Sequence, residues 1–143
     1  MTDCLFCAIA AGDKPAFVVH SDQDVLAFLD VRPVFKGHVL VMPRAHVPTL
    51  TDLDPVGPYF EHVKAAARAV EEGVQAAGTF VALNNKISQS VPHLHTHVVP
   101  RVKGDGLRGF FWPRTKYASD EEAESYAERI GKELGQPGVT PGG

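Results

Sequence analysis

The sequence predicts an α+β fold, in which a five-stranded, mainly antiparallel sheet is combined with one long helix and a C-terminal helix. Five short stretches rich in β-branched and apolar residues lie between turn residues, as strands do. Two longer stretches repeat apolar residues at steps of three and four, as amphipathic helices do. The chain has 143 residues, the length of one domain. We expect that domain to span residues 1–135 and to be followed by a flexible tail over 136–143.

The expected strands are short and are bounded by glycine, proline or polar residues. The first two flank the polar turn "SDQD", and so short a connection favours an antiparallel hairpin. The third is the run "GHVLVMPR", which opens with Gly and closes with Pro and Arg, and the fourth is "TFVALNN". The fifth follows the polar loop "KISQS" and alternates in residue type. In chain order, the strands are expected at residues 16–21, 25–29, 37–44, 79–85 and 93–99.

The long helix is expected to follow the third strand. Asp54 is a favourable N-cap residue, and Pro55 after it suits the first helical position. The helix should end near Gly78. Its apolar stripe is expected to consist of Phe60, Val63, Ala67, Val70 and Val74.

The C-terminal helix is expected to begin with a capping box formed by Ser119 and Glu122. The segment before it, residues 102–118, contains Gly, Pro and aromatic residues without a period, so we expect an ordered loop there. The apolar stripe of this helix is expected to consist of Ala123, Tyr126, Ala127, Ile130 and Leu134.

Composition and charge exclude several classes of protein. A formal net charge of −3 argues against nucleic-acid or anionic-membrane binding through bulk charge. No apolar run approaches the ~20 residues that a membrane span needs. The start "MTDCLFCAIA" lacks the basic residues and long apolar core of a secretory signal. We therefore expect a cytoplasmic protein that has no nucleic-acid or membrane partner.

The stretch "VPHLHTHVVP" places His93, His95 and His97 at every second position. On a strand, these three side chains would share one face. They could be incidental, or they could bind a catalytic metal ion, since zinc accepts imidazole ligands. A third interpretation makes one histidine a nucleophile. Neutral imidazole attacks phosphorus well if one ring nitrogen faces the substrate and the other is hydrogen-bonded, which fixes the tautomer.

The stretch "QSVPHLHTHVV" resembles the signature of the histidine-triad (HIT) nucleotide hydrolases and transferases, His-φ-His-φ-His-φ-φ with φ apolar. Thr96 departs mildly from that pattern. The resemblance extends upstream through "CLFCAIAAGDKPAFVVHSDQDVLAFLDVRPVFKGHVLVMPRAH" and covers about residues 4–101. It implies a HIT-like fold. Ser88 stands where many members have Gly, which reaches positive φ more freely than Ser does.

The resemblance also implies catalytic roles. His95 matches the nucleophile, which attacks the α-phosphate and becomes nucleotidylated. His97 matches a histidine that contacts the phosphate, and His38 in "GHVLV" matches a fourth active-site histidine. Gln89 and Ser90 match a polar pair near the phosphate bridge and the leaving group. No metal is implied at the reacting centre.

The resemblance assigns substrate-binding roles as well. Asp30 matches a carboxylate that binds ribose hydroxyls, and Asn84 matches a residue that helps to hold the active-site loop. The slot for the base is matched by Leu5, Phe6, Ile9 and Phe28.

From the residues alone, simpler interpretations stay open. Gln89 and Ser90 could be turn residues, and Asp30 could be a turn acid. His38 could be a hydrogen-bonded histidine at a strand end. Phe6 and Ile9 would most often belong to the core.

Cys4 and Cys7 form a C-x-x-C pair, and these are the only cysteines of the sequence. A structural zinc site needs four ligands, commonly two Cys and two His. Bacterial members of the family that this chain resembles use such a pair with two histidine positions, which here are His46 and His93. We therefore predict that Cys4, Cys7, His46 and His93 bind one structural zinc ion. Two free thiols or a redox pair are the alternatives.

Two other motifs give weaker evidence about function. The stretch "GDGLRG" at 104–109 matches G-x-G-x-x-G, but "FFWPR" after it cannot form the helix that a dinucleotide site requires. In "GFFWPRTKY", Phe111 and Trp112 lie beside Arg114 and Lys116. They could stack a base or contact phosphates, or they could cover a core edge or a dimer interface.

The resemblance implies a nucleotide hydrolase or transferase acting on a purine nucleoside phosphate conjugate, and a homodimer. The substrate would be a nucleoside phosphoramidate or a dinucleoside polyphosphate, cleaved through a nucleotidyl-histidine on His95. Two alternatives from other classes remain. One is a metal-dependent phosphohydrolase with the triad as ligands, and the other is a non-catalytic nucleotide-binding scaffold.

Overall fold

The computed structural model describes residues 3–107 and 113–135. By its internal contacts the chain divides into two units, Met1–Asp105 and Gly106–Gly143, each described here by itself. The expected tail over 136–143 lies outside the described residues, as do Phe111 and Trp112. The one-domain boundary at residue 135 stays a prediction.

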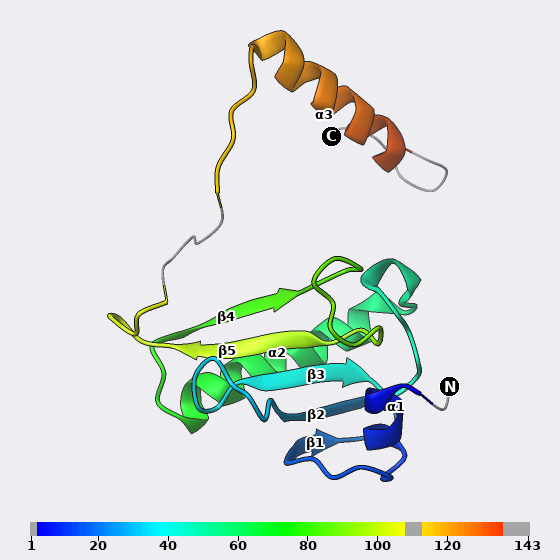
Figure 1. Cartoon of the computed structure of the whole chain (residues 1–143), viewed down its shortest axis with the longest axis vertical. Helices are drawn as coiled ribbons and strands as arrows, with labels where there is room; N and C mark the ends of the chain where they lie inside the picture. The colour runs from blue at the N-terminus through cyan, green and yellow to red at the C-terminus, as the bar shows by residue number, and fades with distance from the viewer. Residues whose placement is uncertain (1–2, 108–112, 136–143) are drawn as a thin grey trace. The chain divides into compact units, whose positions relative to one another are not determined.

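The first unit contains the predicted five-stranded antiparallel sheet (Figure 1). The strand order is β1-β2-β3-β5-β4, so the last two strands in the sequence exchange places in the sheet. Every pairing between neighbouring strands is antiparallel. The strands are β1 (Val18–Ser21), β2 (Val25–Leu29), β3 (Val39–Pro43), β4 (Gly78–Leu83) and β5 (Thr96–Arg101).

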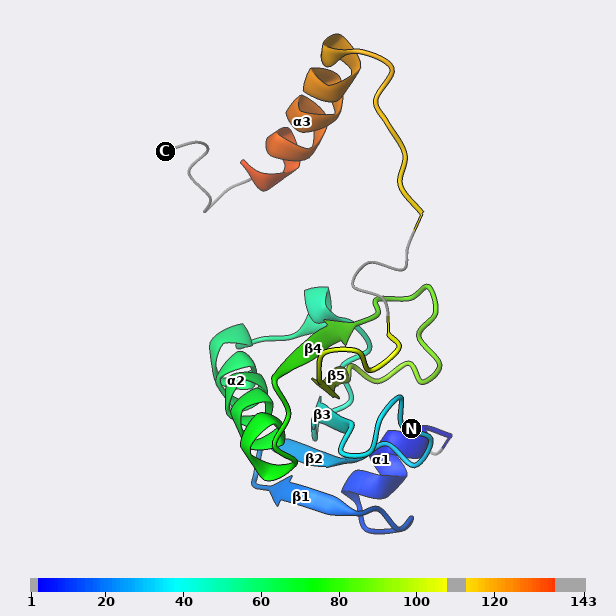
Figure 2. The same ribbon diagram turned by 90° about the vertical axis from the view of Figure 1, so that its left-hand side faces the viewer.

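Two helices lie on opposite faces of this sheet, α1 (Leu5–Ala10) and α2 (Val56–Gly73) (Figure 2). Because side chains alternate along a strand, each strand contributes to both faces. The cluster on the α2 face consists of Val25, Ala27, Val39, Val41, Tyr59, Val63, Val70, Leu94 and Val98. The cluster on the α1 face consists of Cys4, Phe6, Leu26, Phe28, Leu40 and Met42.

The long helix α2 differs from its prediction at both ends. Pro55, and not Asp54, is the N-cap residue, and the last helical residue is Gly73, because the chain must turn before β4 begins at Gly78. Phe60 and Val74, expected in the apolar stripe, are 37% and 48% exposed. Tyr59 is buried instead, and its hydroxyl donates to the carbonyl of Val41 at 2.8 Å.

Helix α1 and the 3₁₀ turn η1 (Leu50–Asp52) were not predicted. Cys4 is the N-cap of α1, and its sulfur accepts a hydrogen bond from the backbone N–H of Cys7 at 3.3 Å. The fifth strand begins at Thr96 and not at residue 93, so the first two histidines of the triad precede it.

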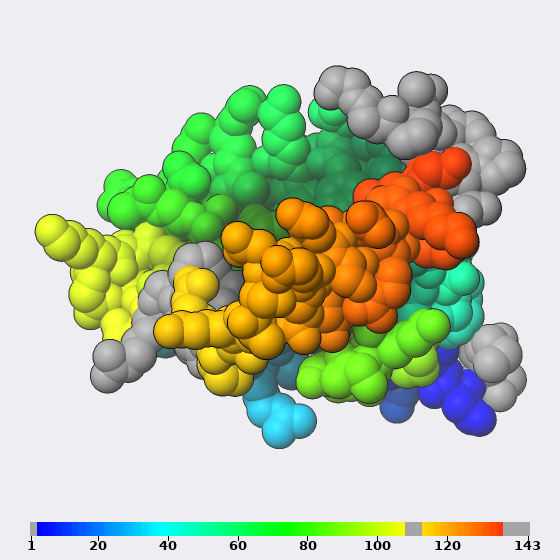
Figure 3. Space-filling model, turned by 90° about the horizontal axis from the view of Figure 1, so that it is seen from above, coloured from blue at the N-terminus to red at the C-terminus, as the bar shows by residue number. Residues whose placement is uncertain are grey.

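In the second unit, α3 (Asp120–Leu134) begins as predicted. The Ser119 side chain accepts from the N–H of Glu122, whose carboxylate accepts from the N–H of Ala118 at 2.7 Å. Ala123 is half-buried, and every other residue of the helix is exposed. Figure 3 shows this helix in orange to red. Of the predicted apolar stripe, Ile130 is 60% exposed. Among the described helices, none has the length and hydropathy for a membrane crossing.

Candidate active site and metal centre

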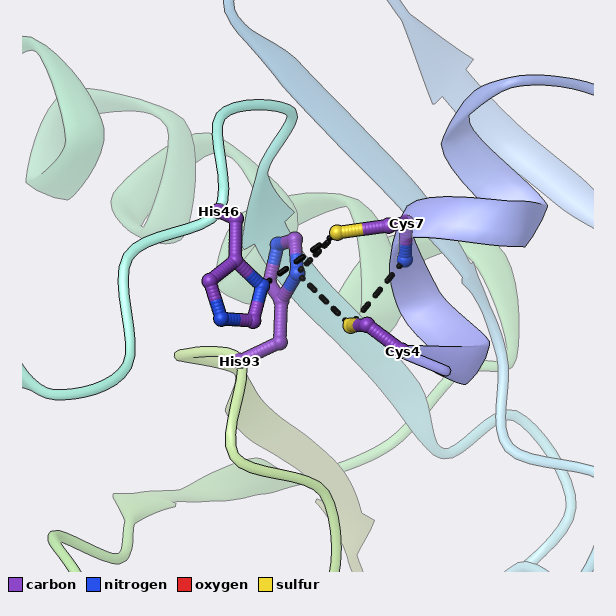
Figure 4. A group of neighbouring side chains, drawn as sticks. All are labelled: Cys4, Cys7, His46 and His93. Atoms are coloured by element: carbon purple, nitrogen blue, oxygen red, sulfur yellow. Dashed lines mark hydrogen bonds between the residues drawn. The ribbon is translucent and has the colours of Figure 1, made fainter. Parts of the chain in front are cut away.

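Two cysteines and two histidines converge beside the first turn of α1 (Figure 4). Their sulfur and ring-nitrogen atoms all lie within 4.8 Å of one another. The Nδ1 of His93 lies 3.5 Å from both sulfurs, of Cys4 and of Cys7, and the Nδ1 of His46 lies 3.2 Å from the Cys7 sulfur. In a tetrahedral zinc site, sulfur and nitrogen ligands lie about 3.6 Å apart, given the usual bond lengths. The four donors therefore fit a zinc ion without rearrangement of the backbone.

Each of these four residues is held by its own local structure. Cys4 and Cys7 are the N-cap and third residue of α1, so one helical turn brings both sulfurs together. His46 lies in the loop after β3, and His93 lies in the bend before β5. His93 is fully buried, and its Nε2 lies 2.7 Å from the Pro43 carbonyl. A carbonyl accepts only, so Nε2 carries the proton and Nδ1 keeps its lone pair for the cluster.

Burial sets the protonation of this cluster in the absence of a cation. It lowers the pKa of His93, so the ring stays neutral and is suited to ligation. Burial, followed by the neighbouring Cys4 thiol, raises the pKa of Cys7. Metal binding at such a site displaces thiol protons.

A pocket of about 440 Å³ opens next to the cluster, on the α1 face of the sheet. His95 and His97 both line it, as does Ser90 at the end of the preceding loop. The pocket also contains all four residues expected to hold the base and the carboxylate expected to bind ribose. These are Leu5, Phe6 and Ile9 from α1, Phe28 from β2, and Asp30 directly after β2.

His95 is held in one tautomer at the wall of the pocket. Its Nδ1 lies 2.8 Å from the backbone carbonyl of His93, so Nδ1 carries the proton and donates it. The Phe6 ring meets the His95 ring edge-on, with centroids 4.9 Å apart. Nε2 is therefore the ring nitrogen with the free lone pair.

His97 is oriented by a chain of hydrogen bonds that starts at the backbone. The N–H of Val34 donates to Nδ1 of His38 at 3.1 Å, so the proton of His38 is on Nε2. That Nε2 donates to Nδ1 of His97 at 2.9 Å, which leaves Nε2 of His97 as an N–H donor. Burial lowers the pKa of His38, and burial also lowers the pKa of His97 to about 4. Both rings are thus neutral at pH 7.

The loop before the triad is held by its own side chains. The amide of Gln89 donates to the Pro48 carbonyl at 2.6 Å and accepts from the N–H of Lys86 at 2.8 Å. The amide of Asn84 donates to the Ser88 carbonyl at 3.3 Å. Gln89, expected near the leaving group, is thus engaged with the loop. Asn84, expected to help hold the loop, has a hydrogen bond to the loop backbone. Ser88 adopts the left-handed conformation, φ +62°, that Gly would adopt without strain.

The pocket also includes residues that the sequence reasoning missed. Lys14 and Arg32 bring positive charge to its wall, and Val91 and Leu40 extend its apolar lining. Lys14 lies shortly after the end of α1. Because that helix was not predicted, nothing placed Lys14 at the pocket. Arg32 directly follows the "LDV" stretch, and its position two residues after Asp30 was the available signal.

A second set of possible metal ligands lies within the pocket region. Ligand atoms of Asp30, His38 and His97 fall within 4.8 Å of one another. His95 does not belong to this set. A metal-dependent mechanism would therefore use His97 and His38 rather than the whole triad.

Comparisons with protein-family models and with solved structures agree on one family. The model of the HIT domain family matches residues 11–104. A HIT family protein from Bacillus subtilis, of known crystal structure, is 36% identical with a TM-score of 0.82, over 92% of this chain and 97% of that one. A Zn-bound histidine triad family protein from Mycobacterium smegmatis is 35% identical with a TM-score of 0.67, over 92% and 98% of the two chains.

A relative with a named activity also matches. The adenylylsulfatase HINT3 of Arabidopsis thaliana is 31% identical over 109 residues, which are 73% of this chain and 55% of that protein. The match to the family model covers all five strands, from β1 to the end of β5. The family model matches well over half of this chain, and the chain therefore belongs to the HIT domain family.

Proposed function

We propose that this chain is a nucleotide hydrolase or transferase that cleaves at the α-phosphate of a nucleoside phosphate conjugate. The observation that supports this most directly is the hydrogen bond from Nδ1 of His95 to the His93 carbonyl, 2.8 Å long. It leaves Nε2 unprotonated in a pocket that is also lined by apolar residues, a carboxylate and two cations. A nucleophile with a fixed tautomer is what covalent catalysis at phosphorus requires.

The proposed reaction has two displacements. Nε2 of His95 attacks the α-phosphorus, a P–N bond forms, and the bond to the leaving group breaks as that group departs with the electron pair. The ring then carries a positive charge, which the His93 carbonyl stabilises through the Nδ1 proton. Water or another acceptor next attacks the same phosphorus, the P–N bond breaks, and the electron pair returns to Nε2.

The surrounding residues have separate proposed roles. The N–H at Nε2 of His97 donates to a phosphate oxygen, and Asp30 accepts from ribose hydroxyls. The base lies between the apolar side chains of Leu5, Phe6, Ile9 and Phe28, which line the same pocket. The adenylyl chemistry in the name of the HINT3 relative is consistent with an α-phosphate as the site of attack.

We further propose that Cys4, Cys7, His46 and His93 bind one structural zinc ion. Their donor geometry and the Zn-bound relative from Mycobacterium smegmatis support this. Zinc would tie α1 to the bend that carries His93, outside the reacting centre. We also propose a homodimer, as the resemblance to the histidine-triad family implies.

The decisive experiment traps the covalent intermediate. The protein is incubated with an adenine nucleotide conjugate labelled in the α-phosphate, denatured rapidly at alkaline pH, and mapped by mass spectrometry. We expect the label on His95, and none on the variant His95→Ala, whose melting temperature and zinc content serve as controls. Label on another residue, or turnover by His95→Ala at the wild-type rate, would refute the proposal.

Two comparisons refine the substrate and the mechanism. Turnover of an adenosine phosphoramidate is measured against that of diadenosine polyphosphates, and the preferred conjugate identifies the leaving group. A chelator is then added under conditions that leave the melting temperature unchanged. Activity should persist; loss of activity that is restored by metal would favour the ligand set of Asp30, His38 and His97.

A further inference from the structure

A third cluster of metal-ligating side chains lies away from the pocket. Its residues come from the β1–β2 hairpin and from helix α2. His20 lies on β1, Asp22 lies in the turn to β2, and His62 lies on α2. Nε2 of His20 and Nε2 of His62 each lie 2.8 Å from the same carboxylate oxygen, Oδ2 of Asp22. The three ligand atoms lie within 4.8 Å of one another, and the two rings are 5.4 Å apart between centroids. Neither the proposed reaction nor the zinc site uses these residues.

The hydrogen bonds of His62 require a proton or a cation between its ring and Asp22. Its Nδ1 lies 2.9 Å from the Pro58 carbonyl, so Nδ1 carries a proton and donates it. In the neutral ring, Nε2 then holds a lone pair that faces the lone pairs of Asp22 Oδ2 at 2.8 Å. Two acceptors at this distance repel unless a proton or a metal cation lies between them.

The carboxylate of Asp22 is held in place independently of the two histidines. Its Oδ1 accepts from the N–H groups of Asp24 and Val25, both at 2.8 Å. Arg44 holds the same turn from outside, since its Nε donates to the Asp22 carbonyl at 2.6 Å. Oδ2 is therefore aimed at the histidines by the backbone. Outer contacts of this kind orient the ligands of protein metal sites.

The chemistry of the donors selects the class of ion. Two imidazoles and one carboxylate suit zinc, copper and nickel, whereas magnesium and calcium prefer oxygen ligands throughout. Three protein ligands leave at least one coordination position for solvent or for another ligand. The side chains are partly exposed, at 50% for His20, 37% for Asp22 and 29% for His62, so an ion can enter from solvent.

We propose that His20, Asp22 and His62 form a second metal site, which binds a divalent transition metal ion such as Zn²⁺ with one position open. The site adjoins a pocket of about 240 Å³ lined by His20, His62 and alanines of α2. It lies on the α2 face of the sheet, and the thiolate cluster lies on the α1 face beside helix α1. The proposal is independent of the nucleotide chemistry proposed above.

Zinc uptake tests the second site directly. Wild-type protein and the variants His20→Gln, His62→Gln and Asp24→Asn are dialysed against the same buffered free Zn²⁺, and bound metal is measured by mass spectrometry. We expect the wild type to bind one more equivalent per chain than either histidine variant, with affinity at the second site falling more than about tenfold in those variants. Asp24→Asn removes a nearby charge but no cluster ligand, so it should bind as the wild type does.

Co²⁺ separates the two sites spectroscopically. At a thiolate site Co²⁺ gives strong sulfur-to-metal charge-transfer absorption, whereas a site of two imidazoles and a carboxylate gives only weak ligand-field bands. The weak bands should be lost in His20→Gln and His62→Gln while the charge-transfer bands remain. His20 is half exposed, so its variant should fold even if the His62 variant does not. Equal metal binding by His20→Gln and the wild type would overturn the proposal and leave a protonated His62 as the balancing charge.

Discussion

The two faces of the sheet are built from the same strands and differ in what they leave open. On the α2 face the core is mostly aliphatic, and the Tyr59 hydroxyl satisfies its polar groups through Thr96 at 2.6 Å and the Val41 carbonyl. On the α1 face, a helix of six residues covers only part of the sheet, and a pocket lined by histidines is left open beside it. Alternate residues of β5 and of the bend before it therefore belong either to the α2-face core or to the pocket wall.

Leu94 and His95 are the sharpest case of this division. Leu94 is fully buried in the α2-face cluster, and its neighbour His95 lines the pocket on the other side. Changes at these two adjacent positions should therefore affect different properties.

The largest expected effect is on stability. Leu94→Ala should lower the free energy of unfolding by about 3 kcal/mol, because it removes a fully buried side chain and leaves a cavity. His95→Ala, next to it, should cost less than half as much and abolish turnover. Urea unfolding and activity per folded molecule are measured for both. Equal destabilisation by the two variants would show that the faces are not separate.

The next effect is a pH dependence that comes from His97 on the α1 face. Burial lowers the pKa of His97 to about 4 from its usual 6.5. Between these values the unfolded chain binds a proton that the folded chain does not, so stability falls as the pH is lowered from 6.5 to 4. The contribution is on the order of 3 kcal/mol.

The variant His97→Asn should flatten that part of the profile. Urea unfolding is followed at several pH values from 4 to 7 in both proteins. Parallel profiles for the variant and the wild type would contradict a depressed pKa at His97.

On the α2 face, Tyr59→Phe should cost about 1–2 kcal/mol. The variant removes a hydroxyl bonded to both Thr96 and the Val41 carbonyl, and it leaves buried acceptors with one donor fewer. Burial raises the pKa of Tyr59 to about 12, so the hydroxyl is protonated at any pH used. Thermal unfolding measures the effect, and nucleotide turnover should be unchanged. A loss of turnover larger than the loss of folded protein would show that the two faces of the sheet are coupled.

The smallest expected effect is a gain. Ser88 holds a left-handed backbone conformation, so Ser88→Gly should stabilise the protein by about 0.5–1 kcal/mol. Ser88→Ala is the matched control, because it removes the hydroxyl but keeps the strain. A gain of the same size in both variants would place its cause in the hydroxyl rather than in the backbone.

The sheet and the presence of α2 were predictable because they follow local periods of two and about 3.6 residues, although Phe60 and Val74 of the predicted stripe are exposed. Helix α1 was missed because six residues are too few to show a period, and because a cysteine is an unusual N-cap. The fifth strand was placed three residues too early, since alternation continues through His93 although the backbone there is bent. Pattern alone does not distinguish an alternating bend from a strand.

The site was partly predictable for a different reason. The resemblance supplied several of the positions that line the pocket. No sequence spacing shows, however, that the Gln89 amide is hydrogen-bonded to Pro48 and Lys86. The cluster of His20, Asp22 and His62 had no local signal either, because it joins a hairpin turn to a helix 40 residues away. Such contacts depend on how the helix packs on the sheet.

His93 belongs to both centres at once. Its Nδ1 lies 3.5 Å from each of the two sulfurs, and its own carbonyl fixes the tautomer of His95. Oxidation of Cys4 or Cys7 would therefore disturb the alignment of His95, the proposed nucleophile, which neither thiol touches. Redox damage at the amino terminus would then appear in kinetic assays as a loss of turnover, and restoring the thiols with a reductant would reverse it.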